Sequence, residues 1–205
     1  MKSAAKAAVR LLMVLLVSPL LLLYFVLRLF SAKDSFFSGF AQLLSLWPGL
    51  LGSYLRVAAY RLTMQHCAAD CYIGFGALFS QQGTEIQAGS YIGPQCNIGL
   101  CRIGENTLLG SGVHILSGKN QHHFADPSKP YKEQGGRFEK VQIGANCWIG
   151  NGAIVMASIG DGCIIGAGAV VTEDLPAGVI AVGNPARIVR TVAELQTKPT
   201  TDATA

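Results

Sequence analysis

The sequence predicts a mainly β solenoid preceded by an apolar helical segment, and three observations carry this prediction. Aliphatic residues recur every six residues in the second half of the chain, as in Ile143, Ile149 and Val155. Glycine repeatedly follows the aliphatic residue, and long uncharged runs fill the first 55 residues. A period of six fits neither a helix nor simple strand alternation. It indicates repeats that each form one flat face and one corner.

Composition separates the two parts and excludes some function classes. Of 205 residues, 50% are hydrophobic and 14% are charged, but 11–27 and 35–55 contain no charged residue at all. The net charge of +4 is dispersed without a basic stripe, which argues against a nucleic-acid partner. No cysteine lies in a C-x-x-C pair, so no zinc site is expected. Cys96, Cys147 and Cys163 occupy matching repeat positions, which indicates small buried side chains in a reducing compartment.

Residues 1–34 are expected to form a membrane-embedded helix. Cations flank the apolar run Leu11 to Leu27 on both sides, and Ser18-Pro19 interrupts it. A signal peptide has a similar layout, but Phe30 is too bulky for a cleavage site at Phe30-Ser31-Ala32. A re-entrant helix that turns at Ser18-Pro19 keeps both basic flanks on one side of the membrane. The flanking cations are Lys2, Lys6, Arg10, Arg28 and Lys33.

Residues 35–71 are expected to form interfacial amphipathic helices. Large apolar residues from Phe36 to Trp47 recur at helical spacing, and Trp47-Pro48-Gly49 then breaks the pattern. Aromatic and cationic residues follow, a mixture typical of a membrane interface. Two alternatives stay open: a second spanning helix over Phe36 to Leu55, and a helix packed only on its own domain.

The repeat itself covers 72–190. Two steps are shorter than six, from Ile98 to Ile103 and from Val155 to Ile159, and each requires a shortened corner. The repeat is interrupted once, over 117–141, and a long excursion from a rigid solenoid is a natural place for function. This loop contains His122 and His123, and imidazole can accept a proton near neutral pH. His66 and His114 lie outside it and are interpreted as surface polar groups, and 191–205 is expected to be a flexible tail.

The repeat resembles the left-handed parallel β-helix acyltransferases, in which three hexapeptides form one triangular coil. In the maltose, galactoside and xenobiotic acetyltransferases a catalytic histidine precedes a Trp-Ile-Gly hexapeptide, as His122 precedes Trp148-Ile149-Gly150 here. His122 is therefore the expected general base, with His123 as the alternative. The loop's residues look most like those of exopolysaccharide and O-antigen acetyltransferases.

The C-terminal part of the repeat resembles the end of the solenoid in CoA-dependent members. The resemblance implies that acetyl-CoA is the acyl donor and that no metal is needed. Many members have lysine after the threonine that corresponds to Thr172, whereas this chain has Glu173, so one expected phosphate contact lacks its lysine. The residues implied to contact pantetheine or the CoA phosphates are Trp148, Ala167, Thr172, Arg187 and Arg190.

The resemblance implies an acetyl-CoA-dependent O-acetyltransferase that acts on a sugar hydroxyl of a cell-surface polysaccharide precursor. Transfer would be direct, in sites between the subunits of a homotrimer, with Asn97 as a weak candidate for acceptor contact. The expected location is the inner (cytoplasmic) membrane, with the catalytic domain facing the cytoplasm, where acetyl-CoA is found.

Other functions on the same fold stay open. An N-acetyltransferase could use a nucleotide-sugar amine, and serine is another possible acceptor. The solenoid could also be a non-catalytic binding module. A metal hydratase similar to the γ-type carbonic anhydrases needs three converging imidazoles, and the spacing of the four histidines does not provide them. The sequence fixes neither the acceptor nor the length of the acyl chain.

Overall fold

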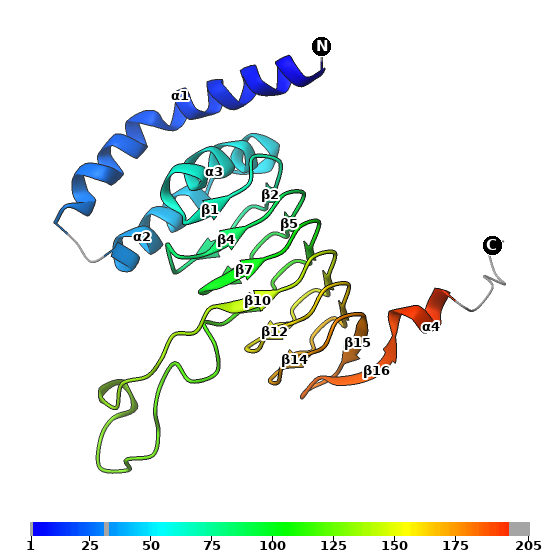
Figure 1. Ribbon diagram of the computed structural model, residues 1–205. Helices are drawn as coiled ribbons and strands as arrows, with labels where there is room; N and C mark the ends of the chain where they lie inside the picture. The colour runs from blue at the N-terminus through cyan, green and yellow to red at the C-terminus, as the bar shows by residue number, and fades with distance from the viewer. Residues whose placement is uncertain (1, 31–32, 197–205) are drawn as a thin grey trace.

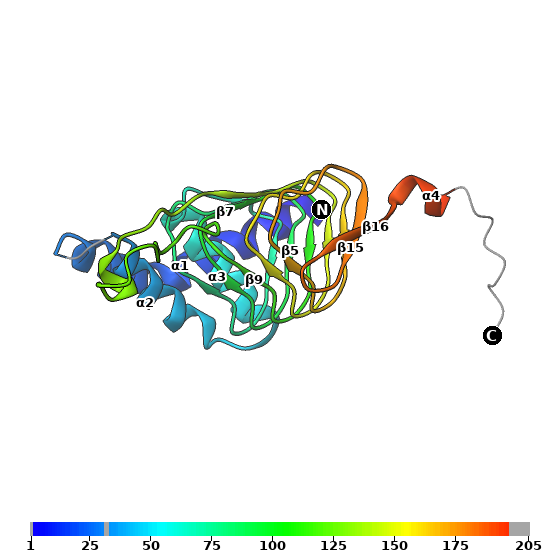
Figure 2. The same cartoon turned by 90° about the horizontal axis from the view of Figure 1, so that it is seen from below.

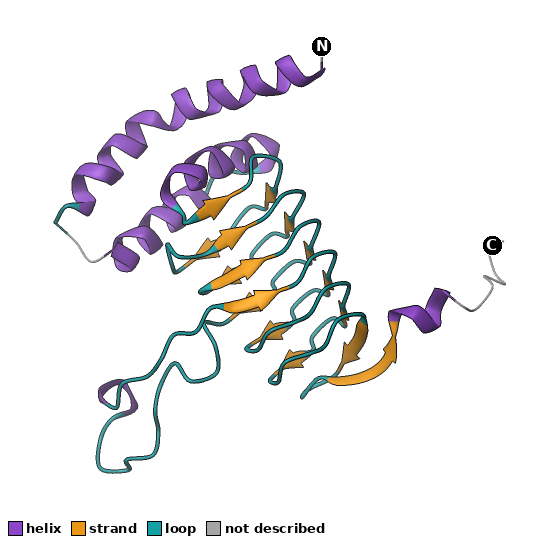
Figure 3. Ribbon diagram, viewed as in Figure 1, coloured by secondary structure: helices purple, strands orange, loops and turns teal. Residues whose placement is uncertain are grey.

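The computed structural model describes residues 2–30 and 33–196 and shows a parallel β-helix of about six turns with helices at its N-terminal end (Figure 1). Successive turns contribute short strands to three sheets of four, seven and five strands, which are parallel except for one strand at the C-terminal end (Figure 3). The predicted mainly β solenoid is therefore confirmed. A triangular prism results, with one sheet on each face and one corner between each pair of sheets.

The strands are two to five residues long, and we number the sheets in the order in which the chain visits them. Sheet 1 contains β1 (His66–Cys67), β4 (Glu85–Ile86), β7 (Cys101–Ile103) and β10 (Val141–Ile143). Sheet 2 contains β2 (Tyr72–Ile73), β5 (Tyr91–Ile92), β8 (Leu108–Leu109), β11 (Trp148–Ile149), β13 (Ile164–Ile165), β15 (Val179–Val182) and the antiparallel β16 (Arg187–Thr191). Sheet 3 contains β3 (Leu78–Phe79), β6 (Asn97–Ile98), β9 (His114–Ile115), β12 (Ile154–Val155) and β14 (Val170–Val171).

Inward-facing residues are six apart across two of the three corners. From sheet 1 to sheet 2, and from sheet 2 to sheet 3, successive inward-facing residues are always six apart, as in Ile143, Ile149 and Val155. Both shortened steps and the long excursion fall instead at the corner from sheet 3 back to sheet 1, which we call the third corner. All irregularity of the solenoid is therefore confined to one edge.

Glycine has two separate roles at the regular corners. The glycine directly after an inward aliphatic residue lies against the next turn, and a Cβ on Gly104 would be 2.4 Å from the carbonyl carbon of Gly144. The left-handed backbone conformation occurs two residues later, at Gly112 or at Asn146, with φ of 66° and 53°. The glycine directly after the aliphatic residue thus permits close stacking of the turns, and a different residue adopts the left-handed conformation of the corner.

All six cysteines are free and buried, as expected of small interior side chains. Within the solenoid, Cys96 donates to the carbonyl of Gly110, Cys147 to that of Gly160 and Cys163 to that of Pro176, each with an Sγ–O distance of 3.1 Å. Burial raises the pKa of the Cys96 thiol to about 11, so this group stays protonated and unreactive.

Three helices cover the N-terminal end of the solenoid: α1 (Lys2–Arg28), α2 (Lys33–Ser45) and α3 (Gly49–Thr63) (Figure 1). The fully buried Arg56 of α3 ties this layer together. Its guanidinium donates to the carbonyl of Ile73 in β2 and to the carbonyls of Leu44 and Trp47 at the end of α2. These backbone acceptors would otherwise be unpaired at a helix end and on the first turn of the solenoid.

The helices of the N-terminal segment differ from one expectation and one alternative. The helix α1 continues through Pro19, so the hairpin turn at Ser18-Pro19 is not formed. Proline has no N–H for the carbonyl of Leu15, and the Ser18 hydroxyl donates to that oxygen at 2.8 Å instead. The alternative second span is also absent, because α2 ends at Ser45 and α3 begins at Gly49. Among the described residues, only Ala7–Arg28 is long and apolar enough to cross a membrane.

The C-terminal end of the solenoid turns back on itself. Strand β16 pairs antiparallel with β15, and the short helix α4 (Val192–Gln196) follows it. The first part of the expected flexible tail is thus helical, and 197–205 lie outside the described residues.

Candidate active site

The long excursion predicted over 117–141 leaves the solenoid at the third corner, after β9, and returns at β10 (Figures 1 and 2). Its outgoing and returning segments run side by side. Glu139 N–H donates to the carbonyl of Ser117 at 2.9 Å, Arg137 N–H to that of Asn120 at 2.8 Å, and His123 N–H to that of Gly135 at 3.0 Å. The excursion is therefore an ordered, hydrogen-bonded arm and not an open loop.

The side chain of Gln134 makes three hydrogen bonds at the tip of this arm. The amide of Gln134 donates to the carbonyls of Asp126 and Lys129, and its oxygen accepts from the N–H of Asp126. A single turn of 3₁₀ helix, η1 (Tyr131–Glu133), precedes this residue. The turn and the amide together fix the far end of the arm.

The two candidate bases lie in the outgoing segment of the arm. His122 and His123 are both exposed, and neither imidazole has a hydrogen-bond partner within 2–30 or 33–196. A general base is normally oriented by a third group. In the single chain that group is missing for both histidines, so the geometry does not choose between them.

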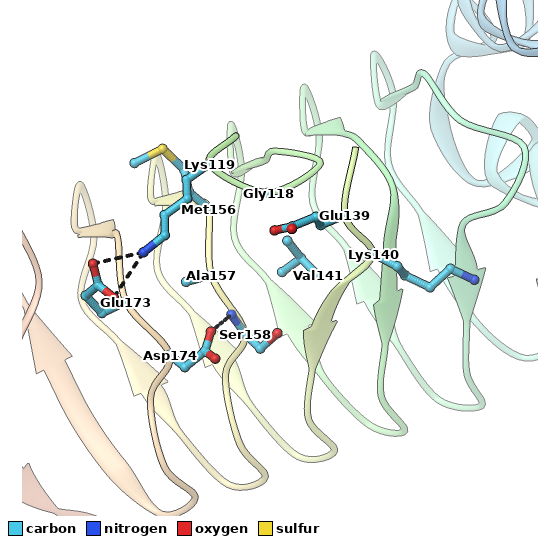
Figure 4. Close-up of a pocket in the computed structure, with 10 residues that line it drawn as sticks. All are labelled: Gly118, Lys119, Glu139, Lys140, Val141, Met156, Ala157, Ser158, Glu173 and Asp174. Carbon is cyan, nitrogen blue, oxygen red and sulfur yellow. Dashed lines mark hydrogen bonds and ion pairs between the residues drawn. The ribbon is translucent and has the colours of Figure 1, made fainter. Parts of the chain in front are cut away.

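A polar cavity of about 430 Å³ lies where the arm leaves the third corner (Figure 4). Val141 and Ala157 contribute apolar surface, and charged side chains surround them. Asp174 accepts a hydrogen bond from Ser158 N–H at 2.8 Å, which links two successive third corners. The residues that line the cavity are Gly118, Lys119, Glu139, Lys140, Val141, Met156, Ala157, Ser158, Glu173 and Asp174.

Two lysines connect the arm to the solenoid by ion pairs. At the outgoing end, the Lys119 ammonium lies 3.0 Å from the Glu173 carboxylate and 3.5 Å from the carbonyl of Thr172. At the returning end, Lys140 donates to Glu85 at 2.7 Å, and this hydrogen bond lowers the pKa of the Glu85 carboxyl. The first pair is solvent-exposed, whereas the second is more enclosed.

The predicted donor-binding residues are distributed over two parts of the molecule. Thr172 lies at the third corner, and Ala167 lies exposed at the corner between sheets 2 and 3. Trp148 points outward from the middle of sheet 2 and is 56% exposed. Arg187 and Arg190 are exposed on β16, at the C-terminal end of the same sheet.

The structure brings His122 and Thr172 to the same edge of one chain, but it does not bring Trp148 there. In a triangular prism the third corner is the edge opposite sheet 2. The arm therefore extends from one side of the molecule, while Trp148, Arg187 and Arg190 lie on the other. One chain by itself does not assemble all the predicted site residues.

Sequence reasoning missed the cavity and its lysines. It noted that Glu173 replaces an expected lysine, but not that Lys119 lies beside Glu173. The sequence did hold a signal for the cavity, because the cavity residues all come from the third corners of successive turns. This signal could be recognised only after each hexapeptide had been assigned to its sheet. The expected surface positions of His66 and His114 are as predicted.

Comparison with known proteins agrees with this architecture. The family model described as the hexapeptide repeat of succinyl-transferase matches residues 140–173, from the return of the arm to Glu173. Nodulation protein L of Rhizobium leguminosarum bv. viciae is 39% identical over 129 residues, which are 57% of this chain and 65% of that protein. The chain spans less than two thirds of the length of the curated relatives it matches.

Solved structures share the solenoid. A maltose O-acetyltransferase from Clostridium difficile 630 has 25% identity and a TM-score of 0.51, covering 78% of this chain and 86% of its own. A hexapeptide-repeat containing acetyltransferase from Vibrio cholerae has 18% identity and a TM-score of 0.52, and the match covers 80% of this chain and 94% of that chain. The second likeness concerns the fold alone. Taken with the repeat and the curated relative, these findings show that the chain is similar to the hexapeptide-repeat acyltransferases.

Proposed function

We propose that the protein is an acetyl-CoA-dependent O-acetyltransferase with His122 as general base. The observation that carries the proposal is the ordered arm, which carries the histidine and leaves the solenoid at a polar cavity on its variable edge. The similarity to a maltose O-acetyltransferase supports acetyl transfer to a hydroxyl. The favoured acceptor is a sugar hydroxyl of a polysaccharide precursor, and the chain faces the cytoplasm at the inner membrane.

The proposed reaction needs no covalent acyl-enzyme. The His122 imidazole takes the proton of the acceptor hydroxyl, and the acceptor oxygen attacks the thioester carbonyl carbon. A C–O bond forms, the C–S bond breaks, and the proton passes from the imidazolium to the departing CoA sulfur. The donor fits the chain's residues: Lys119, Arg187 and Arg190 offer cations for its phosphates, and Trp148 offers a flat apolar surface for its pantetheine arm.

We propose further that the site is completed by a second subunit of a homotrimer. Sheet 2 carries an unbroken outward column of large apolar side chains, in register from turn to turn. Sheet 1 has polar outward residues at the same level, such as Glu85 and Arg102. Packing the apolar column near a neighbour's arm would bring His122 of one chain towards Trp148 of the next. The column is Tyr72, Tyr91, Leu108, Trp148, Ile164 and Ile180.

The chemistry is tested by histidine substitution. His122→Ala is expected to lower the turnover of acetyl transfer to a sugar acceptor by about 10² to 10⁴, the usual contribution of a general base. Binding of acetyl-CoA should survive, and His114→Ala, an exposed histidine on β9, should retain full rate. Loss of activity in His123→Ala with full activity in His122→Ala would move the base by one residue. Full activity in both variants would refute catalysis by the arm.

The shared site is tested by mixing two inactive variants. Chains carrying His122→Ala and chains carrying Trp148→Ala are unfolded, mixed in equal amounts and refolded together. If each site takes its histidine and its tryptophan from different chains, about a quarter of the sites regain both residues. If both residues come from one chain, mixing restores nothing and the trimer proposal fails.

A further inference from the structure

The outer face of α1 is an exposed apolar surface that the proposed reaction does not use. Twelve large hydrophobic side chains between Val9 and Phe30 are more than a third exposed. Isolated exposed hydrophobic residues need no explanation, but a continuous strip along a whole helix indicates a partner. At 1.5 Å per residue, a helix of 27 residues is about 40 Å long.

The opposite face of α1 fixes how the helix lies. Met13, Val17, Leu21 and Tyr24 form a buried ridge at helical spacing. The Tyr24 ring lies 4.5 Å from the Phe40 ring of α2, measured between ring centroids. The ridge holds α1 lengthwise across the end of the solenoid, outside α2 and α3 (Figure 1). A helix that crossed a bilayer alone would have to leave this packing.

The exposed strip continues onto the neighbouring helices. Leu50 and Tyr54 of α3 line one cavity with Val9 and Arg10, and Leu43 of α2 lines another with Leu23 and Leu27. Residues of three helices therefore contribute to the exposed apolar surface. An apolar surface of this extent fits a lipid surface.

The charges at the edges of the strip identify the kind of surface. Arg10 and Arg28 lie at its two ends, and Arg61 is exposed on α3. The sequence contains no acidic residue before Asp34. Cations around an apolar helix face favour the interface of a membrane with anionic lipids.

We propose that α1 lies in the plane of an anionic lipid bilayer, with its outer face at the hydrocarbon boundary and without crossing the membrane. The turns of the solenoid then stack away from the lipid surface. In a trimer with parallel solenoids, all three α1 helices would face the same bilayer. This inference goes beyond acetyl transfer and concerns only how the chain binds the membrane. The proposed catalytic function and the proposed membrane binding can therefore fail independently.

Binding is tested by flotation of the full chain with vesicles of phosphatidylethanolamine and phosphatidylglycerol. The double variant Leu16→Glu, Leu23→Glu should lower the bound fraction by about tenfold or more, because two charges enter the apolar boundary. Ile188→Glu, Val189→Glu is the matched control: its residues are 49% and 53% exposed, against 57% and 55%, but lie at the far end of the solenoid. Equal binding by both variants, or self-association through α1 without lipid binding, would overturn the proposal.

Topology is tested by cysteines at the two ends of the helix, Ala8→Cys and Leu29→Cys in separate chains. The native cysteines are buried, so an impermeant thiol reagent reports mainly on the new ones. For an in-plane helix, both new thiols react from the same side of the membrane, in intact cells or in inverted vesicles. Reaction of one end from outside and the other from inside would show a spanning helix and overturn the proposal. Near-identical circular dichroism and thermal unfolding of all variants confirm that the solenoid is intact.

Discussion

The first two corners of the solenoid and the third corner follow different rules. Both regular corners have the same six-residue step in every turn, and most of them have a close-approach glycine and a left-handed residue. The third corner shortens to four residues from Val155 to Ile159 and expands to the whole arm after Ile115. A single edge of a repetitive fold can thus vary freely while the other two maintain the stacking, and the cavity and His122 lie at this variable edge.

Insertion of one glycine should show the largest difference between the corners. Placed after Gly112, it breaks the step between sheets 2 and 3 and turns the following side chains to the wrong face. We expect a loss of more than about 3 kcal/mol in the free energy of unfolding, or failure to fold. Placed after Gly83, in a third corner, the same insertion should cost less than about 1 kcal/mol. Denaturant unfolding measures both, and equal costs would contradict the comparison.

Two glycine substitutions should separate close approach from backbone conformation. Gly104→Ala is expected to cost about 3 kcal/mol, because its Cβ would meet backbone of the next turn that cannot move aside. Gly112→Ala should cost only about 1 kcal/mol, since its added Cβ has nothing within 4 Å and the strain is in φ alone. Gly112→Asn should cost still less, because Asn146 already has this conformation at an equivalent corner. The reverse order in thermal unfolding would show that conformation dominates.

The ion pair at the return of the arm should make a pH-dependent contribution. The pKa of Glu85 is lowered in the folded state, so its pairing with Lys140 stabilises the fold above the unfolded pKa of about 4.3 and is lost as pH falls. Glu85→Gln should therefore cost about 1 kcal/mol near pH 7. The difference from the parent chain should shrink as pH falls below about 4.3 and vanish once the pH is below the lowered pKa of the folded state. A difference that did not change with pH would show that the pair contributes through packing alone.

The exposed ion pair at the start of the arm should have the smallest effect on stability. Its side chains are 48% and 76% exposed, so Lys119→Met should change the free energy of unfolding by less than about 0.5 kcal/mol. Because Lys119 borders the cavity, the same variant should raise the KM for acetyl-CoA several-fold with little change in kcat. Unchanged kinetics would remove Lys119 from the proposed donor site, and a large loss of stability would make it a structural residue.

The sequence by itself determined the solenoid, the apolar first helix and the excursion that contains His122, because these depend on local patterns. A six-residue period places the inward aliphatic residues on either side of the two regular corners, and a run without charges can bury itself only in lipid or protein. The cysteine positions were predictable for the same reason.

Only the tertiary structure decided which corner varies, how the N-terminal helices join the solenoid and which charges meet at the arm. Each depends on groups from different turns or helices. Arg56 of α3 binds carbonyls at the end of α2 and in β2, and Lys119 reaches a carboxylate 54 residues away. Local propensity cannot reveal such pairs, because their energy arises only when the folded chain brings the two groups within hydrogen-bonding distance.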